Sequence, residues 1–408
     1  MGYETYRIAD LIDEIAMGPF GSNIKVSCFV DSGVPVLNGS NLEGFSLSEK
    51  TFRYVTREKA DSLNKANAHR GDIVITHRGT LGQIVFIPQD SKYDRYVISQ
   101  SQFRVRCNDK VLPEYLVYYF HTPIGQHKLL SNASQVGVPA LARPSSTFQQ
   151  IEVVLPELSI QKRVVEIIST IQKKIVNNQE LNDNLQRQLR TIFKAEFTDN
   201  PELENITQIP LSELCHVVTK GTTPTTLGKP FVESGINFIK AESILDDHSI
   251  DKSKFAFIDE ETNALLKRSI IHAGDVVFTI AGTLGRFALI DENVLPANTN
   301  QAVAIIRADL EKVLPEYIYT CFIGEWHTDY YAKRVQQAVQ ANLSLTTIKS
   351  LPIPLLDEAK MSEYLSLILP LIKAIKINEA QNEKLAALRD NLLPKLMSGE
   401  IDVSAVQL

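Results

Sequence analysis

Apolar residues recur at helical spacing in two long stretches of the chain. In the first stretch, a heptad frame places Val164, Ile171, Asn178, Leu185 and Ile192 at position a and Ile167 and Leu181 at position d, with Ile168, Ile175 and Leu189 widening the stripe. In the second, the same frame places Tyr364, Leu371, Asn378, Leu385 and Leu392 at a and Leu367, Ala374 and Leu388 at d. Such a stripe predicts two long helices that pair as a coiled coil.

Shorter patterns precede each helix. GDIVIT (71–76) and QIVFIP (83–88) read as short strands around a tight glycine turn, and QFRVRC (102–107) alternates with a period of two residues. LPEYLVYYF (112–120) opens a helix with Pro113 at its first position. This mixture predicts an α+β globule of roughly 150 residues.

The whole plan occurs twice. GDIVITHRGTLG (71–82) recurs as GDVVFTIAGTLG (274–285), with Gly, Asp, Val, Thr, Gly, Thr, Leu and Gly identical. LPEYLVYY from Leu112 recurs as LPEYIYTC from Leu314, in the same order. We therefore divide the chain into a first globule at 1–155, a first spacer helix and linker at 156–201, a second globule at 202–355, and a second spacer helix and tail at 356–408.

Chain geometry favours an antiparallel helix pair. A helix from Leu158 to Phe197 would be roughly 60 Å long, and the linker 198–210 can span at most about 45 Å. The second globule most easily lies at the far end, which makes the arrangement pseudo-two-fold, although a parallel pair remains possible. Asn178 and Asn378 at matching a positions would fix the register of the helices, or would simply be partly exposed polar residues. Pro370 should kink the second helix or begin a new segment there.

Composition narrows the class of protein. The 408 residues are 44% hydrophobic, and no window approaches the roughly 18 apolar residues of a membrane span. The N-terminal residues lack a secretory pattern, which predicts a cytoplasmic protein. The four cysteines lie far apart, which predicts reduced thiols and no metal site.

The net charge of −6 argues against a protein that coats nucleic acid through bulk positive charge. Any nucleic-acid contact must come from a few placed side chains. Enzyme signatures are close but incomplete: GTTPTTLGKP (221–230) resembles a phosphate loop, yet six residues separate its glycines and Pro230 replaces the magnesium-binding hydroxyl residue. The sequence therefore predicts a chain without catalytic activity or cofactor.

Several segments together resemble one family. LPELSIQKRVVEIISTI (155–171) and NLLPKLMSGEIDV (391–403) resemble the helical segments of the specificity subunits of type I restriction-modification systems, the HsdS family. The repeated GD and GTLG elements resemble a recurrent element of that family's target recognition domains. The second helix differs in one respect, because its start, LLDEAKMSEYLSLI (355–368), lacks the Gln-Lys-Arg of the first.

The resemblance implies a non-catalytic subunit that recognises double-stranded DNA. Each globule would read one half of a bipartite site, and the helices would set the distance between the halves. The helices would also dock two modification subunits, which methylate adenine N6, and ATP-dependent restriction subunits would complete the complex. Two alternatives stay open from the residues alone: an interaction scaffold without DNA specificity, favoured by the acidic second half, and an enzyme with an unfamiliar site.

Candidate DNA-binding residues come from the turns and from one basic pair. Arg can bind guanine, Asn and Gln can bind adenine, and hydroxyl and amine groups can bind phosphates. In the first globule the candidates are Asn23, Lys25, His77, Arg78, Thr80 and Gln83. In the second they are Lys220, Thr222, Thr223, Thr225, Thr226 and Arg286, with Lys333 and Arg334 as a phosphate-binding pair.

Some of these patterns have a structural alternative. The shared GTLG turn can be a backbone bend that requires its glycines. The basic pair 333–334 can be an ordinary solvated surface. The aromatic run Tyr115, Tyr118, Tyr119 and Phe120 is expected to be core packing, with base stacking as a remote option. Residues that differ between the two copies, such as His77 and Arg78 against Ile280 and Ala281, are the better specificity candidates.

Overall fold

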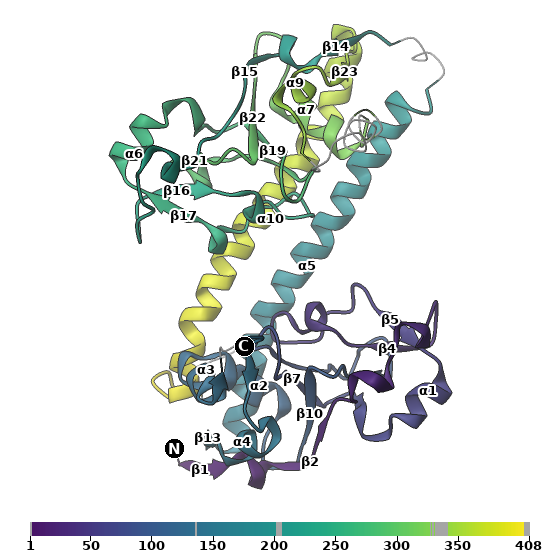
Figure 1. The fold of residues 1–408 in the computed structure, drawn as a ribbon, viewed down its shortest axis with the longest axis vertical. Coiled ribbons are helices and arrows are strands. Elements are labelled where there is room, and N and C mark those ends of the chain that lie inside the picture. The colour runs from purple at the N-terminus through teal and green to yellow at the C-terminus, as the bar shows by residue number, and fades with distance from the viewer. Residues whose placement is uncertain are drawn as a thin grey trace. The chain divides into compact units, whose positions relative to one another are not determined.

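The computed structural model describes residues 2–134, 137–200, 206–326, 328, 330 and 342–403. Two compact units divide the chain. The first combines residues 1–173 with 385–408, and the second spans 174–384. Two long helices, α5 (Leu158–Phe197) and α10 (Glu358–Ser398), contribute to both units (Figure 1).

The first unit is an α+β fold with two main sheets. The strands are β1 (Tyr3–Arg7), β2 (Ile12–Met17), β3 (Phe29–Val30), β4 (Val34–Val36), β5 (Arg53–Val55), β6 (Asn67–His69), β7 (Ile73–Thr76), β8 (Ile84–Phe86), β9 (Arg95–Val97), β10 (Gln102–Cys107), β11 (Ala133–Ser134), β12 (Ala140–Leu141) and β13 (Glu152–Pro156). The helices are α1 (Arg57–Ser62), α2 (Pro113–His121), α3 (Pro123–Leu130) and α4 (Pro144–Gln150). The main sheets have the orders β2-β10-β7-β8 and β3-β5-β4-β9-β6.

The second unit repeats this plan. Its strands are β14 (Gln208–Pro210), β15 (Cys215–Lys220), β16 (Ile236–Ile239), β17 (Ala256–Ile258), β18 (Ile270–Ile271), β19 (Val276–Thr279), β20 (Phe287–Leu289), β21 (Ala297–Thr299), β22 (Val303–Ala308) and β23 (Pro352–Pro354). Its helices are α6 (Glu260–Leu265), α7 (Pro315–Ile323) and α9 (Leu345–Lys349). The sheet β15-β22-β19-β20 matches β2-β10-β7-β8 strand for strand, so the duplication seen in the sequence is confirmed in the fold.

The central strands explain the apolar GD segments. β7 is buried along its whole length, because side chains on both faces of its sheet are covered. Ile73 and Ile75 face the core that contains α2, whereas Val74 faces the core under the second sheet. The aromatic run of α2 belongs to the first of these cores, with all of its rings buried, so core packing is confirmed.

The long helices are antiparallel. In the first unit, Val164 and Ile168 of α5 share a core with Leu393 and Leu396 of α10. In the second unit, Leu185 and Leu189 of α5 share a core with the beginning of α10. The start of one helix therefore packs with the end of the other in both units, as the antiparallel prediction requires.

The predicted d positions are wrong in part. Leu181, Leu367 and Leu388 are about half exposed, at 48%, 52% and 48%. The buried stripe instead joins the a positions to residues four further on, such as Ile168 and Ile175. A straight helix of 3.6 residues per turn drifts away from a strict heptad, and the packing follows that drift.

Pro370 does not begin a new segment, since α10 continues from Glu358 to Ser398. A proline inside a helix costs about 3 kcal/mol or more. The flanking Ile368 and Ile372 are fully or almost fully buried in the second unit's core. Burial of two such side chains contributes about 3–6 kcal/mol, which is enough to offset the proline.

Four asparagines form a symmetric network within the second unit. The side-chain Nδ2 of Asn178 donates to the Asn382 Oδ1 at 2.8 Å, and the side-chain Nδ2 of Asn378 donates to the Asn182 Oδ1 at 2.8 Å. Asn182 and Asn382 then donate to the carbonyl oxygens of Ile375 and Ile175, each at 3.3 Å. The two halves of the network are related by an offset of 200 residues, a local pseudo-two-fold arrangement.

The buried position of Asn178 makes a stability prediction. Its side chain is 1% exposed and also donates to Gln381. Asn178→Leu should lower the free energy of unfolding by about 1–2 kcal/mol, because the amides left behind lose a partner. The neighbouring Asn177, which is exposed, gives the matched control Asn177→Leu with little effect. Equal urea-unfolding midpoints for the two variants would contradict this.

A buried histidine gives the second unit a pH-dependent stability. His248 is 8% exposed, has φ 65°, and stacks on Phe287 with ring centroids 4.0 Å apart. Burial lowers its pKa to about 4, and Arg190 acts in the same direction, while Asp246 and Asp247 oppose the shift.

The unfolded chain takes up this proton near pH 6.5, before the native state does. Stability should therefore be complete above pH 6.5 and fall by about 3 kcal/mol between pH 6.5 and 4. Asparagine tolerates a positive φ. In His248→Asn, the free energy of unfolding measured in urea should therefore depend much less on pH over that window. The exposed His272→Asn should leave the slope unchanged, and equal slopes in both variants would refute the assignment.

Candidate nucleic-acid interface

Three loops of the first unit meet at one edge of the sheet β2-β10-β7-β8. β2 and β7 both end beside the start of β10, with Met17 opposite Phe103 and Thr76 opposite Gln102. The Gly18 amide donates to the Gln102 carbonyl at 2.8 Å. The loop after β2, the turn after β7 and the residues before β10 are therefore held together by the strand register.

The His77 side chain strengthens this junction. The backbone amide of His77 donates to the Ser101 carbonyl at 2.8 Å, and the side-chain Nε2 lies 3.1 Å from the Gln100 carbonyl oxygen. Burial lowers the pKa of His77 below its ordinary value. The imidazole is therefore neutral at pH 7, and because a carbonyl oxygen can only accept, Nε2 carries the proton.

The second unit builds the same junction from different residues. The amide of Gly221 donates to the Val303 carbonyl at 3.2 Å, and the amide of Ile280 donates to the Ala302 carbonyl at 2.8 Å. A Cβ atom on Gly18 would lie 1.8 Å from the Ser99 oxygen, and one on Gly221 would lie 2.0 Å from the Thr299 oxygen. Both loops therefore need glycine at the point where they leave the sheet.

The repeated GD element is structural. Asp275 is fully buried and accepts two 2.7 Å hydrogen bonds from Arg307 and one of 2.8 Å from the His272 amide. Asp72 is held in the same way by Arg106 and the His69 amide. These carboxylates anchor the strand start and lie away from the loop edge.

The glycines of the GTLG turn are also required by the backbone. Gly79 and Gly82 have φ of 93° and 88°, and Gly282 and Gly285 have φ of 78° and 85°. Residues other than glycine rarely adopt these positive φ values. The shared part of the turn thus sets its shape, and the side chains that differ between the units remain the candidates for recognition.

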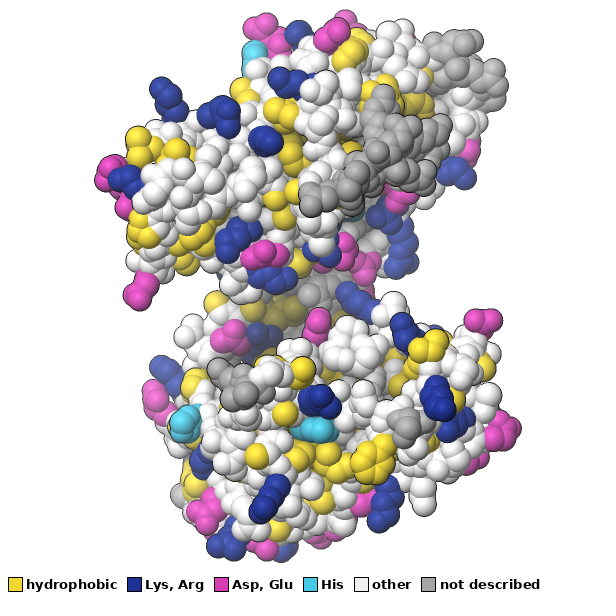
Figure 2. Space-filling model, in the orientation of Figure 1, with side chains coloured by type: hydrophobic (Ala, Val, Ile, Leu, Met, Phe, Trp, Pro, Cys, Tyr) yellow, Lys and Arg dark blue, Asp and Glu magenta, His cyan; other side chains and the backbone are white. Residues whose placement is uncertain are grey.

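The structure brings half of the first-unit candidates together. Asn23, His77 and Arg78 line one cavity of about 670 Å³, together with Lys65 and Gln100. Thr80 is exposed on the same turn, and Lys25 is exposed on the loop after β2. On the unit that carries the N label in Figure 1, Figure 2 shows hydrophobic side chains exposed beside Lys and Arg side chains.

Gln83 is engaged inside the unit. Its Oε1 accepts from the Thr76 hydroxyl at 3.0 Å, and its Nε2 donates to the Gly39 carbonyl at 3.0 Å. Because both ends of the amide already have partners, this side chain stabilises the turn.

The second-unit candidates divide in a similar way. Lys220, Thr225 and Thr226 are exposed. Thr222 accepts from Arg268 at 3.2 Å, and Thr223 donates to Gln301. Arg286 forms a bidentate ion pair with Asp246, at 2.6 and 2.8 Å, and so holds its own turn in place. The pair Lys333 and Arg334 lies outside the described residues.

Sequence reasoning missed the loop before β10. Gln100 borders the first-unit cavity, and Gln301 contacts Thr223 at the corresponding place in the second unit. The signal was present, because a polar run leads into an apolar strand in both copies, SQSQ (99–102) at the start of β10 and NTNQ (298–301) shortly before β22.

The described part of the chain contains no cluster of three or more His, Cys, Asp or Glu side chains that could hold a metal ion. No helix in the described ranges is long and apolar enough to cross a membrane.

Comparison with known proteins gives a consistent result. A family model described as the type I restriction modification DNA specificity domain matches residues 2–187 and again 204–387. The type I restriction enzyme MjaIX specificity subunit of Methanocaldococcus jannaschii is 23% identical over 429 residues, covering 98% of this chain and 94% of the relative. The HindI specificity subunit of Haemophilus influenzae is 23% identical over 423 residues, covering 81% and 87%.

A solved structure shares the fold. The S subunit of a type I restriction-modification system from M. genitalium superposes with a TM-score of 0.55 at 14% identity, covering 97% of this chain and 96% of that one. At this level of identity the likeness concerns the fold alone.

Proposed function

The chain belongs to the family of type I restriction-modification DNA specificity domains, and we propose that it is the DNA-recognition subunit of a restriction-modification complex. Each unit reads one half of a bipartite site in double-stranded DNA. The helices α5 and α10 set the distance between the halves, and the asparagine network that includes Asn178 and Asn378 fixes their register. Catalysis belongs to other subunits.

One observation carries this proposal. The same three loops meet at the same sheet edge in both units, on a backbone shape set by shared glycines, yet the side chains that they present differ. A duplicated backbone with different loop side chains in each copy suits a protein that recognises two different DNA sequences. Half-sites read by such pseudo-two-fold proteins are expected about one helical turn apart, or multiples of it.

We propose that side chains on these loops make the individual DNA contacts. Exposure supports contact by Asn23, Lys25, Arg78 and Thr80 in the first unit, and His77 lines the same cavity as two of them. In the second unit, exposure supports Lys220, Thr225 and Thr226, while Thr222 and Thr223 are half-buried beside them. For Gln83 and Arg286, the bonds described above favour a positioning role in which the side chain shapes the turn.

The helices also offer a surface for partners. Leu181, Leu367, Leu388 and Ile377 are about half exposed on α5 and α10, although they are apolar. Apolar side chains that join into a contiguous exposed patch are typical of interaction sites. We assign them to the docking of two adenine-N6 methyltransferase subunits, which would join restriction subunits in the full complex, in the cytoplasm. In this proposal, residues 1–155 and 202–355 are the two DNA-reading segments. Residues 156–201 and 356–408 are the spacer segments.

A selection experiment tests the function. The chain, assembled with its modification subunits, should enrich a two-part motif with a fixed gap from random-sequence duplexes. Its affinity should fall with salt on a log–log scale, with a slope that reports the phosphates engaged. An interaction scaffold would show neither, so a complex that enriches no two-part motif would contradict the proposal. The isolated chain should show no methyl transfer or DNA cleavage.

A further inference from the structure

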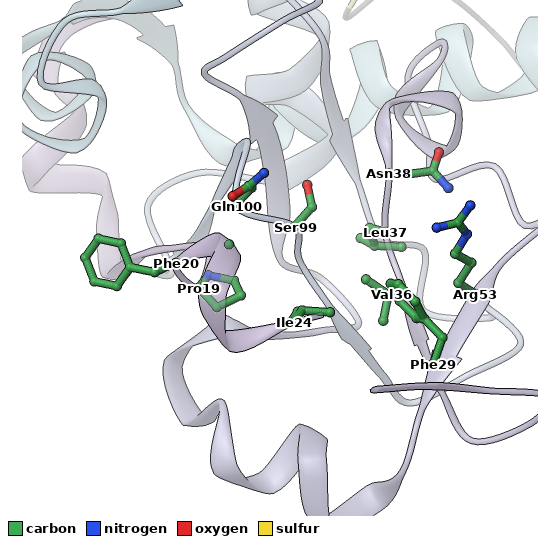
Figure 3. Close-up of a pocket in the computed structure, with 11 residues that line it drawn as sticks. Pro19, Phe20, Ile24, Phe29, Val36, Leu37, Asn38, Arg53, Ser99 and Gln100 are labelled. Atoms are coloured by element: carbon green, nitrogen blue, oxygen red, sulfur yellow. The ribbon is translucent and has the colours of Figure 1, made fainter. Parts of the chain in front are cut away.

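One phenylalanine projects from the sheet edge at which the three loops of the first unit meet. Phe20 lies in the loop after β2 and is 83% exposed, the highest value among the large hydrophobic side chains described. Figure 3 shows its ring turned away from Pro19 and the other side chains of the neighbouring cavity. Leaving an aromatic ring in water forgoes roughly 1.5–3 kcal/mol of burial free energy. A partner that covers this ring would gain that free energy on binding.

The backbone that carries this ring is held in place on both sides. The Asn23 amide donates to the Phe20 carbonyl at 2.8 Å, closing a turn around the residue. The close approach of Gly18 to Ser99, together with its bond to Gln102, fixes the other end of the loop to the sheet. A ring presented by a fastened backbone loses little entropy when it binds.

The surroundings of the ring suit a polyanion. A cavity of about 350 Å³ lies on one side of the Phe20 loop and the cavity of about 670 Å³ lies on the other, and both include Pro19, Phe20, Gly21 and Gln100. Arg53 lines the smaller cavity, and Lys65 and Arg78 line the larger one. Among the described residues, none that lines either cavity is an aspartate or glutamate.

The second unit carries a different group here. Counting from Gly18 and Gly221, which leave the sheet in the same way, Thr223 takes the place of Phe20. The Thr223 hydroxyl is turned to Gln301 within its own unit. The exposed ring is therefore a feature of the first unit's loop and is not part of the shared frame.

We propose that Phe20 is a wedge that inserts between stacked bases of the first half-site and unstacks one base step, while the cations beside it neutralise the flanking phosphates. This inference rests on the proposed DNA-reading function. Apolar side chains that enter a base step kink the duplex, and the cost depends on the sequence of that step. The first half-site is thus read partly through deformability, whereas the second is read without a wedge.

Permanganate, which oxidises unstacked thymines, tests the proposal on the full complex bound to its selected site. With the unaltered chain, thymines at one step of the first half-site should become several-fold more reactive. Phe20→Ala should remove that enhancement and weaken binding by about tenfold, the worth of one base–aromatic stack. Phe20→Leu should retain part of both effects. Val26→Ala, which changes another strongly exposed apolar side chain nearby, should alter neither.

The possible failures can be told apart. If the complex selects no bipartite site, the DNA-reading function itself fails. If it binds its site but Phe20→Ala leaves the thymine pattern and the affinity unchanged, the wedge fails while the function stands. If Phe20→Ala instead weakens assembly with the modification subunits in the absence of DNA, the ring is a protein contact and the wedge is refuted. Enhanced thymine reactivity that survives at the same base step in Phe20→Ala would likewise refute the wedge.

Discussion

Inserting seven residues into each long helix is expected to widen the gap of the recognised site and to leave both half-sites unchanged. Insertions after Lys173 and after Lys384 fall where the two compact units divide, so contacts within each unit are kept. Seven helical residues add about 10.5 Å and nearly restore the facing of each helix. At about 3.4 Å per base pair, the gap should grow by up to about three base pairs.

The original site should then be bound no better than non-specific DNA, which makes this the largest functional effect expected. Selection from random duplexes measures the new gap. An insertion in α5 alone serves as the control, because it moves one helix past the other and should abolish the motif. A double insertion that changes the letters of a half-site, with the gap unaltered, would show that the helices do not act as a ruler.

Asp275→Ala is expected to destabilise the second unit by about 3–5 kcal/mol. The carboxylate is fully buried, and its loss leaves the Arg307 guanidinium without its bidentate partner on a side chain that is only 26% exposed. Removing one partner of a buried ion pair is strongly unfavourable, because the other charge stays in a poorly solvated place.

Asp246→Ala is the matched control. It breaks the similar bidentate pair with Arg286, but the Asp246 side chain is 83% exposed, so water can replace it. The expected cost is below about 1 kcal/mol. Urea unfolding of both variants measures the difference, and a small effect for Asp275→Ala would show that the GD element is not a structural anchor.

Much of the architecture could be predicted because it depends on local patterns. The GDIVIT segment became β7, Pro113 began α2, and the heptad a positions such as Val164 and Leu185 are buried. Duplication added the most, since a repeated order of segments requires a repeated fold. The exposed d leucines were not predictable in this way, because a strict heptad differs from the real helix by a drift that accumulates along its length.

The candidate site was predicted less completely. Loop positions could be placed near an edge, but whether a polar side chain faces outward depends on partners that are distant in sequence. Gln83 is bonded to Gly39, and Arg286 to Asp246, across about 40 residues in each case. The path of the loop that carries Phe20 likewise depends on the close approach of Gly18 to Ser99, which no local pattern contains.

Exchanging one reader tests the central claim most directly. Residues 1–155 would be replaced by the corresponding segment of a family member that recognises another site, and the full complex would be used for selection from random duplexes. We expect one half of the motif to change to that of the donor, while the other half and the gap stay as they were. A motif in which both halves change, or neither, would contradict a subunit built from two separate readers.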